Sequence, residues 1–387
     1  LNAYIAESIN GIRVTQSFVR ENENTGIFNN LSKNYRKSWM RAVMFNFTMG
    51  PSVDIISTFT TALIYVLGVR WILAPDMTLT VGVLIAFTAY IGRFWAPINT
   101  LAGFYNSLLT AISYLERIFE TIDEPVGVRD EPDAIPMPEV AGEVKFSHVS
   151  FGYEPGQKIL EDINFTAKPG ETYAIVGPTG AGKSTIVNLI SRFYNVDSGK
   201  ITIDGIDISK VTLHSLRTQM GIMMQDSFIF SGDIEDNIRY GKLDATREEI
   251  VNASKTVCAD EFISKMLDGY QTEVRERGSM LSQGQKQLIS FARTLLSDPA
   301  ILILDEATSS IDVQTEKALQ TGLNAMLKGR TSFIIAHRLS TIRNCDKIMY
   351  IDNGGIMESG THDELMAKKG YYYKLYTAQL DEVQKAG

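Results

Sequence analysis

The sequence has few cysteines and no excess of positive charge. Its 387 residues include two cysteines, Cys258 and Cys345, and carry a net charge of −8. Two distant cysteines provide neither a disulfide framework nor a metal-ligand spacing, and they favour a reducing compartment such as the cytoplasm. The negative net charge gives no support for nucleic acid as a partner. The N-terminus also lacks the charged, apolar and small-residue order of a signal peptide.

Long uncharged runs are present, and they are confined to the first ~125 residues. Four basic residues precede the first run: Lys33, Arg36, Lys37 and Arg41. A basic cluster beside an apolar run is typical of the cytoplasmic side of a membrane. We expect spans over residues 45–73 and 78–101, because a span needs about 20 apolar residues. A buried helical hairpin in a soluble protein is the alternative, but such a protein rarely needs two consecutive runs of this length.

The second apolar stretch, residues 77–115, is longer than a bilayer is thick. As a helix it would measure about 57 Å, against about 30 Å for the hydrocarbon core. Its inner end is therefore expected to project into the cytoplasm. Arg93, its one charged residue, would lie deep in the bilayer, where it would contact either a transport pathway or a structural ion-pair partner.

A segment rich in proline and acidic residues, 125–141, is the predicted linker between a membrane part, 1–124, and a second domain, 142–387. In the second domain short apolar runs alternate with helical patterns, which predicts a layered α/β fold. The runs expected as strands are 144–151, 172–176, 201–203, 221–224, 301–304, 331–336 and 347–351. Ligands of such sheets bind at the carboxyl ends of the strands.

A glycine-rich stretch follows the run 172–176 and precedes a helical pattern. Its residues are Gly177, Pro178, Thr179, Gly180, Ala181, Gly182, Lys183 and Ser184. Such a loop turns its N–H groups around phosphate oxygens, and the next helix points its positive end at the same place. Lys183 would reach the outer phosphates, Ser184 would hold Mg²⁺, and Thr185 would donate to an inner phosphate. The alternative is a simple glycine-rich strand-to-helix turn.

Polar residues follow three other expected strands. Asp305 is suited to Mg²⁺ coordination, and Glu306 is placed to orient or deprotonate a water that attacks the γ-phosphate. His337 could hydrogen-bond the γ-phosphate and this water, and Gln225 could sense the metal or the water. For the acidic pair a helix N-cap is the alternative interpretation, and for His337 a structural role.

The segment Leu281-Ser-Gln-Gly-Gln285 opens a helix that continues to Leu296. Ser282 is the expected N-cap, and this could be its whole role. A second exposed helix N-terminus is also an anion site. The phosphate loop at residues 177–184 would need this second anion site only if two copies of the domain came together.

In their order along the chain these motifs are similar to those of ABC transporter ATPases. They are Gly177 to Ser184, Gln225, Leu281 to Gln285, Ile301 to Glu306, Ser309 to Asp312 and His337. Over its whole length the chain resembles the C-terminal part of an ABC exporter half-transporter of the multidrug and lipid type. The resemblance implies an α-helical transmembrane segment followed by an α/β P-loop NTPase domain.

The resemblance also assigns roles to single residues. Tyr153 matches the aromatic residue that stacks on adenine, and Asp312 matches a loop that crosses between two ATP sites. Gln225 matches the loop that links nucleotide state to the membrane domain. Residues 11–21 look like the second coupling helix. The signature residues, which contact the γ-phosphate of ATP bound to the opposite subunit, are Ser282, Gln283, Gly284 and Gln285.

The function implied is ATP hydrolysis, with ATP and Mg²⁺, coupled to efflux of a drug or lipid through the plasma membrane. A lipid flippase or a peptide exporter of the same fold is the alternative. A soluble ABC protein is disfavoured by residues 45–115. Gln283 and Arg275 stand at positions where many members of the family have glycine. The Leu-Ser-Gln-Gly-Gln signature is similar to that of one half of bacterial heterodimeric exporters. With Glu306 retained, this favours a heterodimer over a homodimer.

The family has six spans in each half, and two are visible in this sequence. We therefore expect the sequence to be part of a longer subunit, which would not transport without its missing spans.

Overall fold

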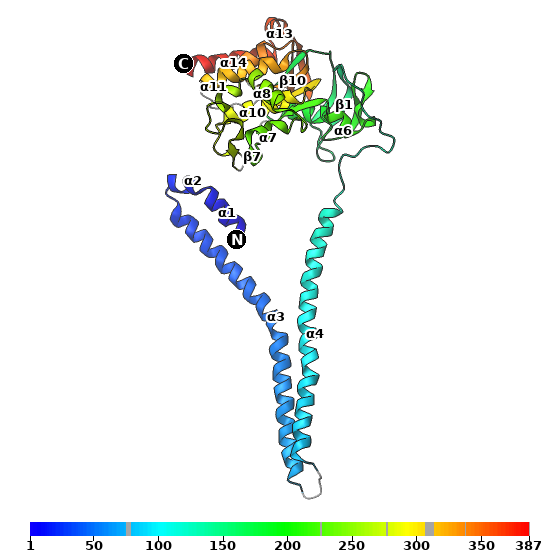
Figure 1. Ribbon diagram of the computed structural model, residues 1–387, viewed down its shortest axis with the longest axis vertical. Coiled ribbons are helices and arrows are strands. Elements are labelled where there is room, and N and C mark those ends of the chain that lie inside the picture. Colours follow the sequence, from blue (N-terminus) through cyan, green and yellow to red (C-terminus); the bar gives the residue numbers. More distant parts are fainter. Residues whose placement is uncertain (75–78, 225–226, 276–277, 306–312, 337, 387) are drawn as a thin grey trace. The chain divides into compact units, whose positions relative to one another are not determined.

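The computed structural model describes the chain except residues 75–78, 225–226, 276–277, 306–312, 337 and 387. It divides into two compact units, Leu1–Pro125 and Val126–Gly387. The described part of the first unit is helical, and the second unit combines β-sheets with helices (Figure 1).

The described residues of the first unit form the helices α1 (Asn2–Asn10), α2 (Ile12–Ser17), α3 (Glu21–Ile72) and α4 (Val81–Ile122). Helices α3 and α4 pack as a hairpin (Figure 1). A Cβ atom at Gly68 of α3 would overlap the side chain of Leu84 on α4, so the glycine permits this close approach. The Thr80 side chain caps α4 by accepting a hydrogen bond from the Val83 N–H at 3.4 Å.

Two helical segments of this unit are long and apolar enough to cross a membrane, Pro51–Ile72 and Val81–Ile122. Their side chains are mostly exposed within the unit, with 6% and 11% of the respective segments buried. Apolar side chains exposed in this way fit contact with lipid or with further helices. Helix α4 has 42 residues and is therefore about 63 Å long, twice the thickness of a hydrocarbon core.

The second unit is built on a six-stranded sheet with the order β12-β11-β3-β10-β9-β6. Its strands are β3 (Thr172–Val176), β6 (Met220–Met223), β9 (Ile301–Asp305), β10 (Thr331–Ile335), β11 (Lys347–Asp352) and β12 (Gly355–Gly360). All neighbours are parallel except β11 and β12. Every residue of β3 and β10 is buried, as expected for parallel strands covered on both faces.

The two faces of this sheet belong to two hydrophobic cores. Ala174 and Val176 of β3 contribute to one core, and Tyr173 and Ile175 contribute to the other. This alternation follows from the two-residue period of a strand. Each face of the six-stranded sheet is therefore buried in its own core.

A four-stranded antiparallel sheet, with the order β2-β1-β4-β5, packs beside the six-stranded sheet and shares one of its two cores. Its strands are β1 (Val144–Phe151), β2 (Leu160–Ala167), β4 (Ser198–Ile203) and β5 (Ile206–Asp207). A short pair, β7 (Gly232–Asp233) and β8 (Glu273–Val274), forms a third sheet. The strands β2, β5, β7, β8 and β12 were not among those expected from the sequence.

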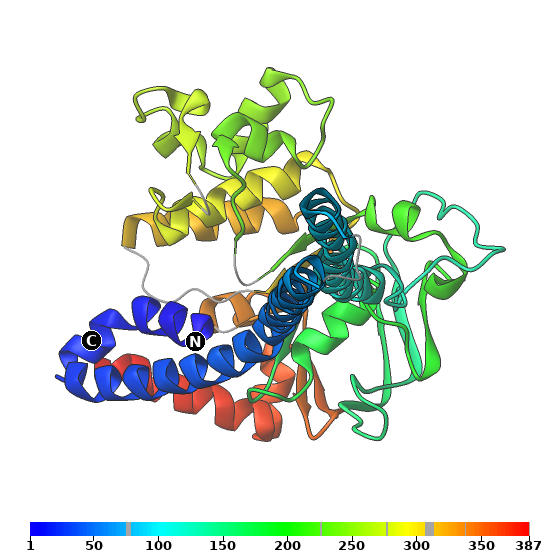
Figure 2. The same ribbon diagram turned by 90° about the horizontal axis from the view of Figure 1, so that it is seen from below.

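Helices cover the sheets of the second unit. They are α5 (Lys183–Ile190), α6 (Leu213–Arg217), α7 (Ile234–Arg239), α8 (Arg247–Thr256), α9 (Asp260–Ile263), α10 (Gln283–Leu296), α11 (Val313–Leu327), α12 (Leu339–Arg343), α13 (His362–Lys368) and α14 (Tyr371–Ala386). Helix α10 lies at the centre of one helical layer, where it contacts α7, α8 and α11 (Figure 2).

The segment predicted as a linker, 125–141, lies almost wholly within the second unit and is hydrogen-bonded to the rest of it. The Ile135 N–H donates to the carbonyl of Lys210, and the Thr212 N–H donates back to the carbonyl of Ile135. Arg192, which is buried, also donates to the carbonyl of Arg129. Most of this proline-rich segment is therefore held against the rest of that unit.

Candidate phosphate-binding site

A cavity of about 390 Å³ opens at the carboxyl end of β3. Among the described residues, those that line it are Tyr153, Ile159, Thr179, Gly180, Gly182, Lys183, Ser184, Thr185, Asp305 and Ile335. The structure thus brings most of the predicted phosphate loop together with Asp305 at the end of β9 and with Tyr153 after β1. Three segments that are distant in the sequence meet at one end of the sheet.

The loop between β3 and α5 takes its shape from its glycines. Gly177, Gly180 and Gly182 have φ values of 145°, 84° and 99°, which disfavour any residue with a Cβ atom. A Cβ at Gly177 would also collide with the carbonyl oxygen of Ile351 on β11. Helix α5 begins at the end of the loop with Lys183, so its first free N–H groups face the lined cavity.

Lys183 is a cation held largely out of water. Its side chain is 9% exposed, and its Nζ atom donates to the carbonyls of Gly177 at 2.9 Å and Pro178 at 2.7 Å. Burial lowers the pKa of Lys183 below 10.5, and the Asp305 carboxylate partly opposes this change. A desolvated ammonium beside free helical N–H groups favours an anion in the cavity.

Two oxygen donors in the cavity fit a magnesium ion. Ser184 and Asp305 both line it, and hydroxyl and carboxylate oxygens are ligands that Mg²⁺ prefers. Among the described residues no three His, Cys, Asp or Glu side chains cluster to form an all-protein metal site. This set suits Mg²⁺ that is shared with a phosphate group, which is how proteins usually bind this ion.

Tyr153 forms an aromatic wall of the cavity. Its hydroxyl lies 3.2 Å from Oγ1 of Thr185, and 44% of the residue is exposed. The ring packs edge to face against Phe151 and Tyr194, with centroid separations of 5.0 and 4.9 Å. Tyr194 could not be identified from the sequence, because it comes close to Tyr153 only when β1 packs against the end of α5.

Three predicted catalytic residues, Gln225, Glu306 and His337, lie outside the described residues. The strands that precede them, β6, β9 and β10, are parallel neighbours. Asp305 pairs with Ile335 at the carboxyl ends of β9 and β10. The chain therefore leaves all three strands at the edge of the sheet that carries the cavity.

The segment that opens α10 forms a reciprocal capping box. The Gln285 N–H donates to Oγ of Ser282 at 3.2 Å, and the Ser282 N–H donates to Oε1 of Gln285 at 2.9 Å. The Ser-x-x-Gln spacing is a sequence signal for this cap, and sequence reasoning did not use it. Ser282 and Gln283 are exposed, whereas Gly284 is buried.

The cavity at the phosphate loop contains no part of this cap. Among the described residues that line it, none belongs to 282–285. Oγ of Ser282 accepts one hydrogen bond and retains its own proton as a donor. The exposed start of α10 is thus available to a ligand that lies outside this cavity.

Comparison with known proteins identifies both parts of the chain. Residues 160–309 match the family model for the ABC transporter, and residues 1–98 match the model for the ABC transporter transmembrane region. An uncharacterized ABC transporter ATP-binding protein of Bacillus subtilis, YknV, is 49% identical over 98% of this chain and 62% of its own length. A fatty acid ABC transporter ATP-binding/permease protein of Mycobacterium tuberculosis is 41% identical over 98% of the chain and 59% of its own length.

A solved structure of a bacterial Atm1-family ABC exporter with ATP bound is also similar. The match covers 97% of this chain and 66% of the chain in that structure, with a TM-score of 0.80 and 34% sequence identity. The chain spans about three fifths of the length of the curated relatives named above. The fold class expected from the sequence is confirmed: the chain belongs to the ABC transporter family and joins part of its transmembrane region to its ATP-binding domain.

Proposed function

We propose that the full-length protein is the ATP-hydrolysing subunit of an ABC exporter in the cell membrane, with its ATPase domain in the cytoplasm. The observation that carries this proposal is the cavity in which the phosphate loop, Asp305 and Tyr153 meet. Its position in a chain with two apolar segments long enough to span a membrane favours transport over a soluble role.

Nucleotide binding follows from the side chains around the cavity. Tyr153 stacks on adenine, and the loop N–H groups together with Lys183 hold the phosphates. Ser184 and Asp305 would hold Mg²⁺, which would neutralise negative charge on the outer phosphates. Thr185 donates to an inner phosphate when its hydroxyl turns from Tyr153.

Hydrolysis transfers the γ-phosphoryl group of ATP to water and releases ADP. Glu306 orients the water and accepts its proton as the new P–O bond forms and the bond to the β-phosphate oxygen breaks. His337 hydrogen-bonds the γ-phosphate and the water, and Gln225 responds to the loss of the γ-phosphate. These three roles are assigned from sequence motifs.

A second subunit completes the ATP site. Residues 282–285 of one subunit are proposed to contact the γ-phosphate of ATP held by the other, because in this chain they lie outside the lining of its own cavity. The Leu-Ser-Gln-Gly-Gln sequence favours a heterodimer whose second subunit has a degenerate catalytic site. Turnover of a Ser282→Ala variant distinguishes the two assemblies, since Ser282 serves the site on the partner.

Transport is coupled to nucleotide through the closed state of the dimer. ATP binds the closed arrangement more tightly than the open one, and this difference supplies the free energy for moving residues 11–21 and the spans. Relatives named for fatty acid transport and for putative multidrug export support a hydrophobic or amphipathic substrate.

The test is the Glu306→Gln variant of the full-length protein in its native assembly. Loss of the carboxylate base is expected to reduce the rate of phosphate release at least about 100-fold, while ATP binding stays at wild-type affinity. Both quantities are measured on the same purified sample. Phosphate release at the wild-type rate would remove Glu306 from its role and contradict the proposed site.

A further inference from the structure

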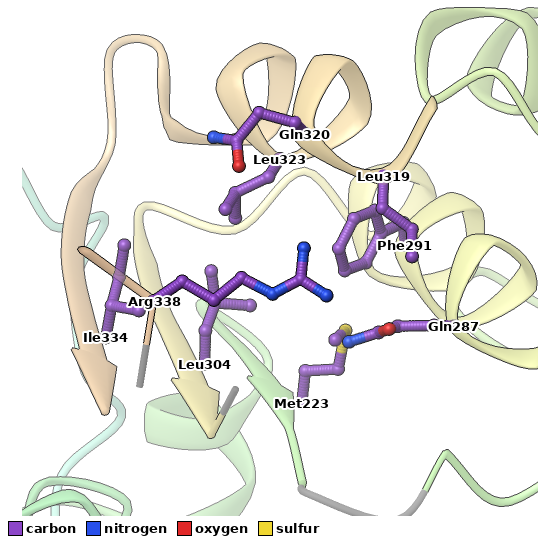
Figure 3. A pocket seen from close by; sticks show the side chains of 9 residues that line it. All are labelled: Met223, Gln287, Phe291, Leu304, Leu319, Gln320, Leu323, Ile334 and Arg338. Atoms are coloured by element: carbon purple, nitrogen blue, oxygen red, sulfur yellow. The ribbon is translucent and has the colours of Figure 1, made fainter. Parts of the chain in front are cut away.

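A second, smaller cavity lies inside the second unit, between the core sheet and helices α10 and α11 (Figure 3). Its volume is about 20 Å³. In the part of the chain that the structure describes, its lining consists of Met223, Gln287, Phe291, Leu304, Leu319, Gln320, Leu323, Ile334 and Arg338. Most of these side chains are apolar, so the polar groups in the cavity have few hydrogen-bond partners other than one another.

Arg338 reaches from one wall of this cavity to the others. It follows His337 directly in the sequence and is the N-cap residue of α12. Its Nη1 atom donates to Oε1 of Glu316 on α11 at 2.6 Å. Figure 3 shows the guanidinium extending across the cavity towards Gln287 and Phe291, both on α10. One side chain therefore joins the start of α12 to α11 and points towards α10.

Gln287 presents an unpaired acceptor in the same cavity. The residue is 6% exposed, and its Oε1 atom has no hydrogen-bond partner among the described residues. A buried acceptor without a donor is unfavourable, and native proteins rarely retain one without a role. The guanidinium of Arg338 carries five N–H donors, so a small shift of α10 or of this side chain would satisfy the amide oxygen.

We propose that Arg338 is a positioning residue that ties the start of α12, one residue after His337 in the sequence, to α11 and α10. The ion pair with Glu316 fixes this start to α11, and the approach to Gln287 depends on the position of α10. Ser282 is the N-cap of α10. Turnover at this chain's own ATP site therefore depends on whether its signature residues, 282–285, engage ATP at the opposite site. The inference rests on the proposed roles of His337 and Ser282, and Arg338 itself does not touch the nucleotide.

The test compares Arg338→Gln with a matched control, Arg330→Gln, in the full-length protein in its native assembly. Arg330 precedes the other end of β10, its side chain is 16% exposed against 19% for Arg338, and it pairs with Asp298 at the same 2.6 Å. A purely structural role predicts similar effects of both substitutions. For each variant the measurements are kcat, KM and the Kd for ATP.

Arg338→Gln is expected to lower kcat about tenfold, a typical size for loss of an interaction that couples two sites. The Kd for ATP should stay within about threefold of the wild type, and Arg330→Gln should change kcat less than about twofold. Arg338→Lys, which keeps the positive charge, should recover part of the lost kcat. An equal loss of kcat in the Arg338 and Arg330 variants, or a change in KM alone, would overturn the proposal.

Glu316→Gln provides a second route if Arg338→Gln does not fold. The Glu316 side chain is 49% exposed, so the fold should tolerate its change, and kcat should fall about threefold. Wild-type kcat in this variant overturns the positioning role. Glu306→Gln separates the two proposals: if it is inactive while the Arg338 and Glu316 variants turn over normally, the proposed function stands and the role of Arg338 is wrong.

Discussion

At the scale of single residues, Lys183 shows how the site is prepared for an anion. Burial lowers the pKa of Lys183 in the folded chain below 10.5, the value for the unfolded chain. At a pH between these two pKa values, the unfolded chain therefore binds more protons than the folded chain does. Stability therefore rises with pH through this window, and at neutral pH the buried ammonium costs stability. A phosphate group in the cavity would offset this cost, which connects the burial of the side chain with ligand binding.

Lys183→Met keeps most of the side-chain volume and removes the charge. We expect the Kd for ATP to rise at least about tenfold, equivalent to about 1.4 kcal/mol. The thermal midpoint without nucleotide should stay equal to that of the wild type or rise, because the desolvated charge is gone. Calorimetric titration and thermal unfolding measure the two effects. Wild-type affinity for ATP would contradict the assignment of the phosphate loop.

The sequence predicted residues that belong to continuous motifs. The phosphate loop, Asp305 and Tyr153 were identified in this way, and the structure places them around one cavity. Tyr194 and Arg338 were not identified, because their partners lie on elements that meet only in the folded chain. The roles of Gln225, Glu306 and His337 remain predictions.

At the scale of elements, the first turn of α10 has an observed structural role and a proposed functional one. The capping box between Ser282 and Gln285 satisfies two N–H groups that a helix otherwise leaves unpaired. The same turn is the proposed contact to ATP on a second subunit. A change in Ser282 is therefore expected to affect the stability of this chain and, if the proposed contact forms, the chemistry of the other site.

Ser282→Ala should lower the free energy of unfolding by about 1 kcal/mol through loss of the cap, whereas Ser282→Thr should keep most of it. In a heterodimer with a degenerate second site, turnover at the Glu306 site should fall no more than about tenfold, because Ser282 completes the other site and acts on the Glu306 site only through α10. Denaturant unfolding and phosphate release measure the two effects. A much larger loss of turnover would contradict the heterodimer and favour a homodimer.

Strand prediction succeeded where strands are buried on both faces. The central strands β3, β9 and β10 are continuous apolar runs, which sequence reasoning recognised. Strand β2 carries polar residues on its exposed positions, and β12 is an edge strand bounded by glycines at 355 and 360. Their pattern depends on neighbouring strands, so short sequence windows did not reveal them.

At the scale of the whole molecule, one part of the chain is suited to lipid and the other to water. The segments Pro51–Ile72 and Val81–Ile122 are apolar over most of their surface, whereas the second unit buries its apolar residues in two cores. This contrast made the division into a membrane part and an ATP-binding part predictable. The substrate was not predictable, because the walls of a transport pathway are built by several spans packed together.

The most direct test of the account is ATP-driven accumulation of an amphipathic probe, such as a fluorescent fatty acid, in inside-out vesicles that contain the full-length protein with its partner subunit. We predict accumulation with ATP for the wild type and its loss in Glu306→Gln, although the variant still binds ATP. Equal accumulation by both proteins would contradict the central claim that hydrolysis at this site drives export.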